Sequence, residues 1–217
     1  MFVEQLYTGC LSEAAYYIES DGEAAIIDPL RDIDDYLEIA SQRKTTIKYI
    51  FETHFHADFV SGHLDLSKVT GATIVYGPGT QTKFPVHIAR DGEVFKIGAL
   101  TVEVLHTPGH TLESSCYLLK DENGKDHCIF TGDTLFVGDV GRPVATAAGL
   151  ERLRLRHVFA DATVQRKPSV REGTHLRPVR VLEPNRGDGC VRLGQSRAGD
   201  DRKEKNRLHR RCGAHLT

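Results

Sequence analysis

Three apolar segments of this sequence each lead into a side chain that can bind a metal ion. "IKYIF" is followed by "ETHFHAD" at residues 52–58, "TVEVL" by "HTPGH" ending at His110, and "CIF" by "TGD" ending at Asp133. Short runs of β-branched and aromatic residues bounded by turn residues are typical of strands. Three strand ends that each offer a ligand side chain indicate a layered, sheet-based domain with a metal site where those ends meet.

Two amphipathic segments interrupt the predicted strands. Residues 32–44, "DIDDYLEIASQRK", have apolar residues at helical spacing, acids at the start and bases at the end, as the helix dipole favours. A second helix is predicted to begin near Ser61 and to stop at Gly71. Strands are predicted in "AAYYIES", "EAAIIDP", "IKYIFET", "ATIVYG", "EVFKIG", "LTVEVLHT", "SSCYLLKD" and "HCIFTGD". Many strands with two helices favour a layered α/β domain whose sheets are not mainly simple βαβ units.

Charge divides the chain sharply near residue 143. Residues 1–143 carry 11 Lys and Arg against 22 Asp and Glu, whereas residues 144–217 carry 17 against 8 and contain no Ile or Tyr. The second part is predicted to be a basic, Arg-rich tail without a packed core, apart from a possible helix over residues 147–159. The abrupt change suggests the hypothesis that residues 144–217 are read in a shifted frame or are an unrelated replacement.

The remaining composition points to a cytoplasmic protein. No apolar run approaches the length needed to cross a bilayer, and the N-terminus lacks a basic segment followed by an apolar one. The five cysteines show no CxxC spacing, so we expect reduced thiols rather than a disulfide framework. They are Cys10, Cys116, Cys128, Cys190 and Cys212.

Within "ETHFHAD", His54 and His56 are two residues apart. In extended backbone such residues point to the same side, so both rings can face one point, and Asp58 continues that side. Two histidines with an aspartate in a strand-to-helix loop favour a metal site over a structural role.

The ordered segments "THFHAD", "TPGHT" and "TGDTLF" resemble the motifs of the metallo-β-lactamase superfamily, whose first motif is usually THxHxDH. The resemblance covers about residues 1–143 and implies an αββα sandwich with the metal at one edge of two facing sheets, here incomplete on the C-terminal side. Within the superfamily, "HADFVSGH" and "GDVGRP" are most similar to the persulfide dioxygenases, including bacterial forms.

Phe59 bears on the number of metals. In the two-zinc hydrolases of this superfamily the residue after the motif aspartate is a histidine that binds the second metal, and a phenylalanine has no lone pair to offer. Those hydrolases also need a later histidine, for which no segment after residue 143 has the strand-end context. We therefore predict one metal per chain.

The resemblance also implies roles for single residues. His54, His110 and Asp133 match the iron ligands of the persulfide dioxygenases and form the two-histidine, one-carboxylate set that suits Fe(II). We expect His56 and Asp58 to orient a ligand or a bound water. Arg142, in "GRP", matches a family arginine near the site. The alternative set, His54, His56 and His110 around one Zn²⁺, also makes a chemically sound hydrolase site and stays open.

The implied reaction is the oxidation by O₂ of a low-molecular-weight persulfide, of the glutathione type, to sulfite and free thiol. A zinc-dependent thiolester hydrolase of the glyoxalase II kind is the first alternative. An inactive truncated product whose basic tail binds polyanions nonspecifically is the second. We expect small-molecule partners only, namely the persulfide or thiol and O₂, with no membrane and no specific nucleic acid.

Overall fold

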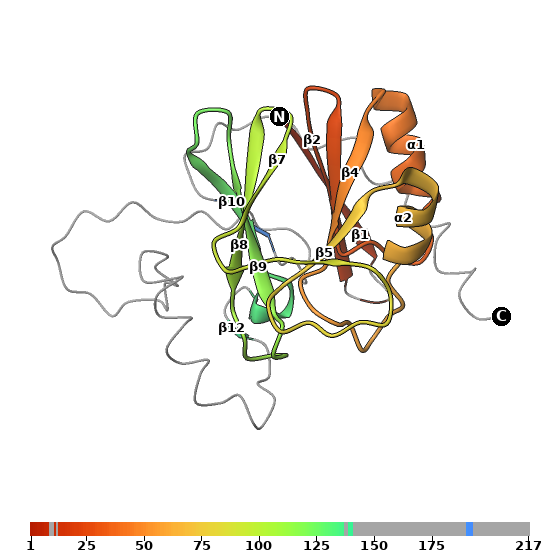
Figure 1. Ribbon diagram of the computed structural model, residues 1–217. Helices are drawn as coiled ribbons and strands as arrows, with labels where there is room; N and C mark the ends of the chain where they lie inside the picture. The colour runs from red at the N-terminus through yellow and green to blue at the C-terminus, as the bar shows by residue number, and fades with distance from the viewer. Residues whose placement is uncertain (9–10, 12, 137–138, 141–189, 193–217) are drawn as a thin grey trace, which may run out of the picture.

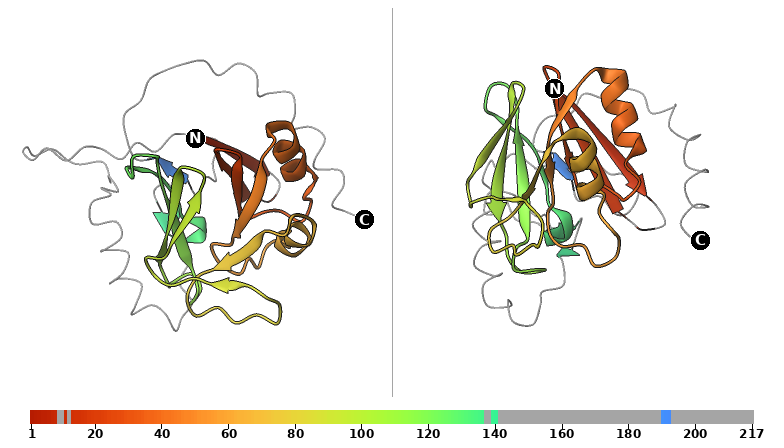
Figure 2. Two further views of the ribbon diagram at one scale, coloured as in Figure 1. Left: turned by 45° about the horizontal axis from the view of Figure 1, so that its top comes forward. Right: turned by 45° about the vertical axis from the view of Figure 1, so that its right-hand side comes forward.

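The computed structural model describes residues 1–8, 11, 13–136, 139–140 and 190–192 (Figure 1). Two sheets face each other, and two helices lie on the outer face of the first sheet in all the views (Figures 1 and 2). Within the described residues no helix is long and apolar enough to span a lipid bilayer. The predicted helix over residues 147–159 and the proposed change of reading frame lie outside this part of the chain.

The first sheet is mixed. Its strands, in spatial order, are β1 (Phe2–Thr8), β2 (Glu13–Ser20), β3 (Glu23–Ile27), β4 (Thr46–Phe51), β5 (Thr73–Tyr76) and β6 (His87–Ile88). The first three pair antiparallel, and the pairs from β3 to β6 are parallel. Helix α1 (Asp34–Arg43) connects β3 to β4, and α2 (His63–Thr70) connects β4 to β5. Parallel neighbours need such crossovers, and these bring the ends of β3 and β4 to the same edge.

The second sheet is antiparallel throughout. Its order is β13 (Cys190–Arg192), β10 (Asp126–Phe130), β9 (Ser115–Lys120), β8 (Leu100–His106) and β7 (Val94–Ile97). After β10 come a 3₁₀ turn (Gly132–Thr134) and a hairpin of β11 (Leu135–Phe136) with β12 (Asp139–Val140). Strand β13 lies inside the predicted tail, at a sheet edge beside β10, and had not been predicted. That the tail lacks a packed core stays a prediction.

Two apolar layers hold these elements together. Ile18 and Ile27 point between the sheets, where they meet the second sheet's Tyr117 and Phe130. Their neighbours in sequence point outward and pack below the helices, as Tyr17 does. A sheet buried on both faces accounts for the continuous apolar runs of its strands.

Most predicted elements are confirmed. Both helices form, and Gly71 ends α2 with a φ of +74°, a left-handed conformation that glycine adopts without steric cost. All eight predicted strands form, while β1 and the short strands β6, β11, β12 and β13 had not been predicted. The layered α/β class is confirmed, with the helices of the described residues on the first sheet alone.

Candidate metal centre

Three loops at one end of the two sheets bring the predicted ligands together. His54 follows β4, His110 lies between β8 and β9, and Asp133 lies in the 3₁₀ turn after β10. Asp133 Oδ2 is 4.0 Å from His54 Nε2 and 3.4 Å from His110 Nε2. Ligand atoms of all three residues lie within 4.8 Å of one another. Two imidazoles and one carboxylate at this spacing suit a first-row transition metal such as iron or zinc.

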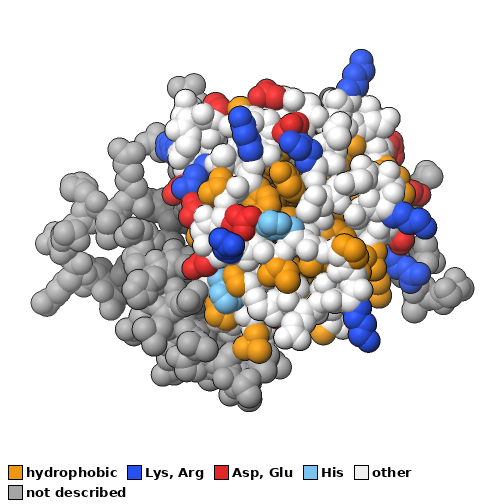
Figure 3. All heavy atoms as spheres, in the orientation of Figure 1, with side chains coloured by type: hydrophobic (Ala, Val, Ile, Leu, Met, Phe, Trp, Pro, Cys, Tyr) orange, Lys and Arg blue, Asp and Glu red, His pale blue; other side chains and the backbone are white. Residues whose placement is uncertain are grey.

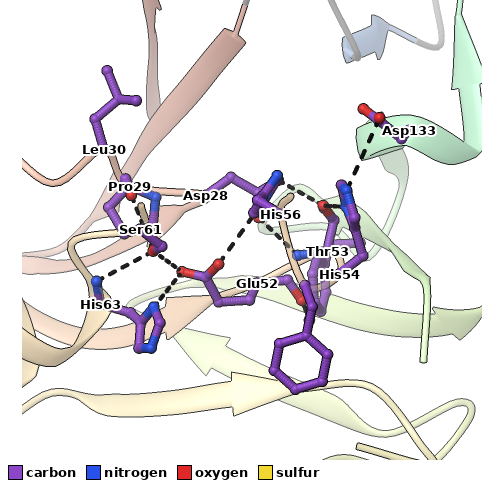
Figure 4. Close-up of polar contacts among 12 residues, drawn as sticks. Asp28, Pro29, Leu30, Glu52, Thr53, His54, His56, Ser61, His63 and Asp133 are labelled. Atoms are coloured by element: carbon purple, nitrogen blue, oxygen red, sulfur yellow. Dashed lines mark hydrogen bonds and ion pairs between the residues drawn. The ribbon is translucent and has the colours of Figure 1, made fainter. Parts of the chain in front are cut away.

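A chain of polar contacts orients the His54 ring (Figure 4). Thr53 Oγ1 donates a hydrogen bond of 2.8 Å to Asp28 Oδ2 and lies 3.0 Å from His54 Nδ1. Because the hydroxyl proton is committed to Asp28, the hydroxyl oxygen accepts from Nδ1–H, and the lone pair of His54 is left on Nε2. Burial, reinforced by His56, lowers the pKa of His54 to about 4, so the ring is neutral at pH 7. A neutral ring with its free nitrogen toward Asp133 is prepared to bind a metal.

His56 points to a different place. Its Nε2 lies 3.0 Å from Asp28 Oδ1 and 3.8 Å from Glu52 Oε2, away from Asp133 (Figure 4). Burial alone would lower the pKa of His56, but the charge of Asp28 and its direct contact raise it to about 9. A protonated imidazole offers no lone pair to a metal. The expectation that His54 and His56 face one point therefore does not describe this structure, because β4 ends at Phe51 and the backbone beyond it is not extended.

Asp28 and Glu52 form a buried acidic cluster around His56. Asp28 follows β3 with a φ of +48° and is 5% exposed, and Glu52 is fully buried. Although burial opposes it, His56 holds the pKa of Asp28 below its ordinary value, whereas burial raises the pKa of Glu52. Glu52 Oε1 accepts a hydrogen bond of 2.6 Å from Ser61 and lies 3.4 Å from His63 Nδ1. The sequence contains no motif that singles out either His63 or Glu52 as part of this cluster.

Close packing fixes the loops to one another. A Cβ added to Gly132, whose φ is +47°, would lie only 2.3 Å from Thr53 Oγ1, so only glycine lets the turn before Asp133 approach the His54 loop. The backbone N–H of Phe55 donates to Glu113 Oε1 at 3.0 Å, and that of Ser115 donates to the Thr53 carbonyl at 2.9 Å. The second sheet thus holds the first sheet's loop in place.

A cavity of about 60 Å³ opens beside Asp133, one of the three proposed ligands. Its polar lining is Glu13, Asp28, His56, Asp58 and Asp133, and its remaining lining is Ala14, Tyr16, Phe59, Phe130, Gly132 and Phe136. One ordered water requires roughly 10–15 Å³, so a small substrate group fits. On the face shown in Figure 3, hydrophobic side chains lie exposed among charged and histidine side chains.

The other predicted site residues have different positions. Asp58 is exposed and lines the cavity, and Phe59 packs on the His56 ring with a centroid distance of 4.3 Å. Arg142 lies outside the described residues. Glu13, at the start of β2, lines the cavity and had not been singled out, because an acid inside an apolar strand carries no motif.

Comparisons with known proteins agree with this architecture. A probable hydroxyacylglutathione hydrolase of Schizosaccharomyces pombe is 34% identical over 143 residues, which cover 63% of this chain and 54% of the relative. A crystal structure of a metallo-beta-lactamase from Staphylococcus aureus is 36% identical, with a TM-score of 0.67, and the match covers 74% of this chain and 51% of that one. The chain thus spans about half the length of these relatives.

A second solved structure, ETHE1 from Myxococcus xanthus, is 33% identical with a TM-score of 0.58. This match covers 65% of the present chain and 61% of that protein. The family profile of the Metallo-beta-lactamase superfamily matches residues 8–181, a range that continues past the last motif identified in the sequence. With a match over most of its length, this chain belongs to the metallo-beta-lactamase superfamily.

Proposed function

We propose that this chain is a persulfide dioxygenase that uses one iron ion, held by His54, His110 and Asp133, to oxidise a glutathione-type persulfide to sulfite. The observation that carries the proposal is the convergence of two imidazoles and one carboxylate while His56 is paired with Asp28. Two-histidine, one-carboxylate sets with open positions are typical of non-haem Fe(II) oxygenases. Phe59, where a two-metal site needs a ligand, supports a single metal.

The residues present fit such an ion. His54 is neutral with its free nitrogen toward Asp133, and Asp133 has an oxygen within 4.0 Å of both imidazoles. When bound, the metal supplies open coordination positions for small ligands and stabilises negative charge on a substrate atom.

The chain's own side chains would prepare the site in two ways. The Asp28–Thr53 contact keeps the proton of His54 on Nδ1, which fixes the direction of the ring. The rings of Phe59, Phe130 and Phe136 line the cavity and exclude water from part of it. Excluding water strengthens electrostatic interactions with a charged sulfur.

A second candidate is a zinc-dependent thiolester hydrolase acting on a glutathione conjugate. This candidate is supported by the sequence relatives, which are named hydroxyacylglutathione hydrolases. The names of these relatives favour the hydrolase, whereas the ligand set favours the dioxygenase. The same three side chains are acceptable zinc ligands and leave a position for water. Both candidates share a glutathione-type substrate that contains a reactive sulfur.

One experiment separates the two. The full chain is purified without oxygen, its metal content is measured by mass spectrometry, and it is given glutathione persulfide with O₂ or a hydroxyacyl thiolester of glutathione. Iron with release of sulfite supports the dioxygenase, whereas zinc with thiolester hydrolysis supports the second candidate. Asp133→Ala is the control that must lose either activity. Turnover of neither substrate by the metal-loaded chain would contradict both.

A further inference from the structure

One carboxyl group in the cavity has no structural explanation. Glu13 is 8% exposed, and neither of its side-chain oxygens has a hydrogen-bond partner in the part of the chain that the structure describes. Buried polar groups in native proteins nearly always have partners, so an exception calls for a functional reason. Its place in the cavity lining beside Asp58 and Asp133 indicates that the missing partner is a bound molecule.

In the metal-free protein the surroundings of Glu13 favour its protonated form. Three acids and one imidazolium act on it electrostatically, namely Asp28, Glu52, Asp58 and His56. Burial is the main effect and Asp28 adds to it, and together they raise the pKa of Glu13 to about 9. A neutral carboxyl group can donate a hydrogen bond and a proton, which a carboxylate cannot.

Both candidate reactions need such a donor, because both release a thiolate. We propose that Glu13 is a catalytic acid whose carboxyl group protonates the thiolate that leaves when the substrate's bond to sulfur is cleaved. The inference rests on the proposed function only in requiring a sulfur leaving group. It applies to the persulfide and to the thiolester alike.

The protons and electrons balance in each case. In the persulfide, O₂ oxidises the outer sulfur, water adds the third oxygen of sulfite, and the S–S bond breaks with its electron pair on the inner sulfur. In the thiolester, water adds to the carbonyl carbon and the C–S bond breaks with its pair on sulfur. In both, the thiolate takes the proton of Glu13, and one proton of the consumed water restores the carboxyl group.

The cavity suits this transfer. Tyr16 and Phe130 pack together in its wall with ring centroids 4.7 Å apart, which limits access of water to the acid. A thiol has a pKa of about 8.5, and an acid of similar strength gives a nearly balanced proton transfer. Asp58, which is exposed, is not shielded from water in the same way.

Two variants of the full, metal-loaded chain test the role. Glu13→Gln keeps the size of the side chain but cannot transfer a proton, and Glu13→Ala leaves space for a small acid. We expect both to lower kcat by about 10²–10⁴-fold, the usual contribution of general acid catalysis, with bound metal unchanged. Ammonium chloride, but not sodium chloride of equal ionic strength, should restore part of the rate to Glu13→Ala and none to Glu13→Gln.

A wild-type rate in Glu13→Gln, or a failure of ammonium to rescue Glu13→Ala, would overturn the proposal in favour of a structural role. A separate measurement does not depend on turnover. The infrared difference between wild type and Glu13→Gln at pH 7 should contain the C=O band of a protonated carboxyl group. If this band is absent, Glu13 is not the catalytic acid, even if the chain oxidises persulfide. If the band is present but the chain turns over neither substrate, the proposed function is refuted and the protonated state of Glu13 is not.

Discussion

The hydroxyl oxygens of Thr107 and Thr134 lie 3.1 Å apart and join the loop that carries His110 to the turn that carries Asp133. Both threonines are buried, and Thr107 Oγ1 also lies 3.4 Å from Cys116 Sγ. Since each threonine is within three residues of a predicted ligand, we expect this contact to help fix the separation of the His110 ring from the Asp133 carboxylate.

Replacing Thr107 with valine should therefore weaken metal binding. Losing a group that hydrogen-bonds a ligand directly typically costs about 10–100-fold in metal affinity, so this indirect contact should cost no more than the lower end, about 10-fold. Thr107→Ser should stay near wild type because it keeps the hydroxyl group. Competition with a chelator measures the affinity. Thr70→Val removes a hydroxyl that bonds the Leu66 carbonyl at 2.7 Å in α2 and serves as the control. Equal affinities for Thr107→Val and Thr70→Val would show that the contact does not position the ligands.

The metal ligands themselves are tested by substitution. His54→Ala, His110→Ala and Asp133→Ala should each remove most of the one metal ion expected per chain, because each deletes a ligand. His56→Ala and Asp58→Asn should keep part of it, since these residues are expected only to orient other groups. Metal analysis after gel filtration gives the stoichiometry.

Two results would contradict this assignment. A reproducible two metals per chain, both needed for activity, would mean that Phe59 does not prevent a second site. An empty site in His56→Ala together with a filled one in Asp133→Ala would establish the three-histidine zinc arrangement instead.

Asp28→Asn should destabilise the fold. Asparagine tolerates the left-handed backbone at this position, so the change adds no backbone strain. It removes the charge that faces His56 and one of the two oxygens that accept hydrogen bonds from Thr53. Removing one partner of a buried ion pair typically costs about 3–5 kcal/mol. Urea unfolding measures the loss. Asp21→Asn, at an exposed turn residue with a φ of +50°, is the matched control and should leave the free energy of unfolding nearly unchanged.

The stability of the metal-free protein should fall as the pH rises from 7 to above 9. The pKa of His56 is about 9 in the folded state against an ordinary 6.5, so its contribution is complete below pH 6.5 and is lost as the pH passes 9. The pKa of Glu13, about 9 against an ordinary 4.5, acts in the same direction because the folded state holds the extra proton. Urea unfolding across this pH range measures the change in stability. A rise in stability would contradict the raised pKa values of both His56 and Glu13.

Glu13→Gln should flatten that dependence. The glutamine side chain has no acidic proton to lose, so the part that belongs to Glu13 disappears. The parts that belong to His56 and to Glu52, whose pKa burial also raises, remain. His54 acts oppositely and at lower pH. Its pKa is about 4 in the folded state, so its contribution is present above pH 6.5 and is lost as the pH falls toward 4. If Glu13→Gln and wild type show the same slope between pH 7 and 9, Glu13 is not protonated in the folded state.

The position of the site follows from features that are local in sequence. Apolar runs end just before residues 52–58, His110 and Asp133, and the ends of such strands meet at one edge once the sheets face each other. The direction of His56 does not follow from local pattern. It depends on Asp28, which is 28 positions earlier and reaches His56 only through the parallel pairing of β3 with β4.

Strand β13 and the acid Glu13 escaped prediction for a related reason. A three-residue edge strand has too little periodicity to be distinguished from its surroundings. The burial of Glu13 results from packing against the cavity wall, to which residues more than 100 positions away contribute, such as Phe130 and Phe136. Contacts between residues so far apart in the sequence cannot be predicted from a short stretch of it.

The proposed ligands belong to both sheets, His54 to the first and His110 with Asp133 to the second. A metal bound by all three has its complete site only where the two sheets are docked, so its binding free energy adds to the stability of their docking. Such a ligand stabilises the folded state by RT ln(1 + [L]/Kd), which at a hundredfold excess over Kd is about 2.7 kcal/mol. Metal supply and sheet docking are therefore linked, and a chelator should lower the free energy that holds the two sheets together.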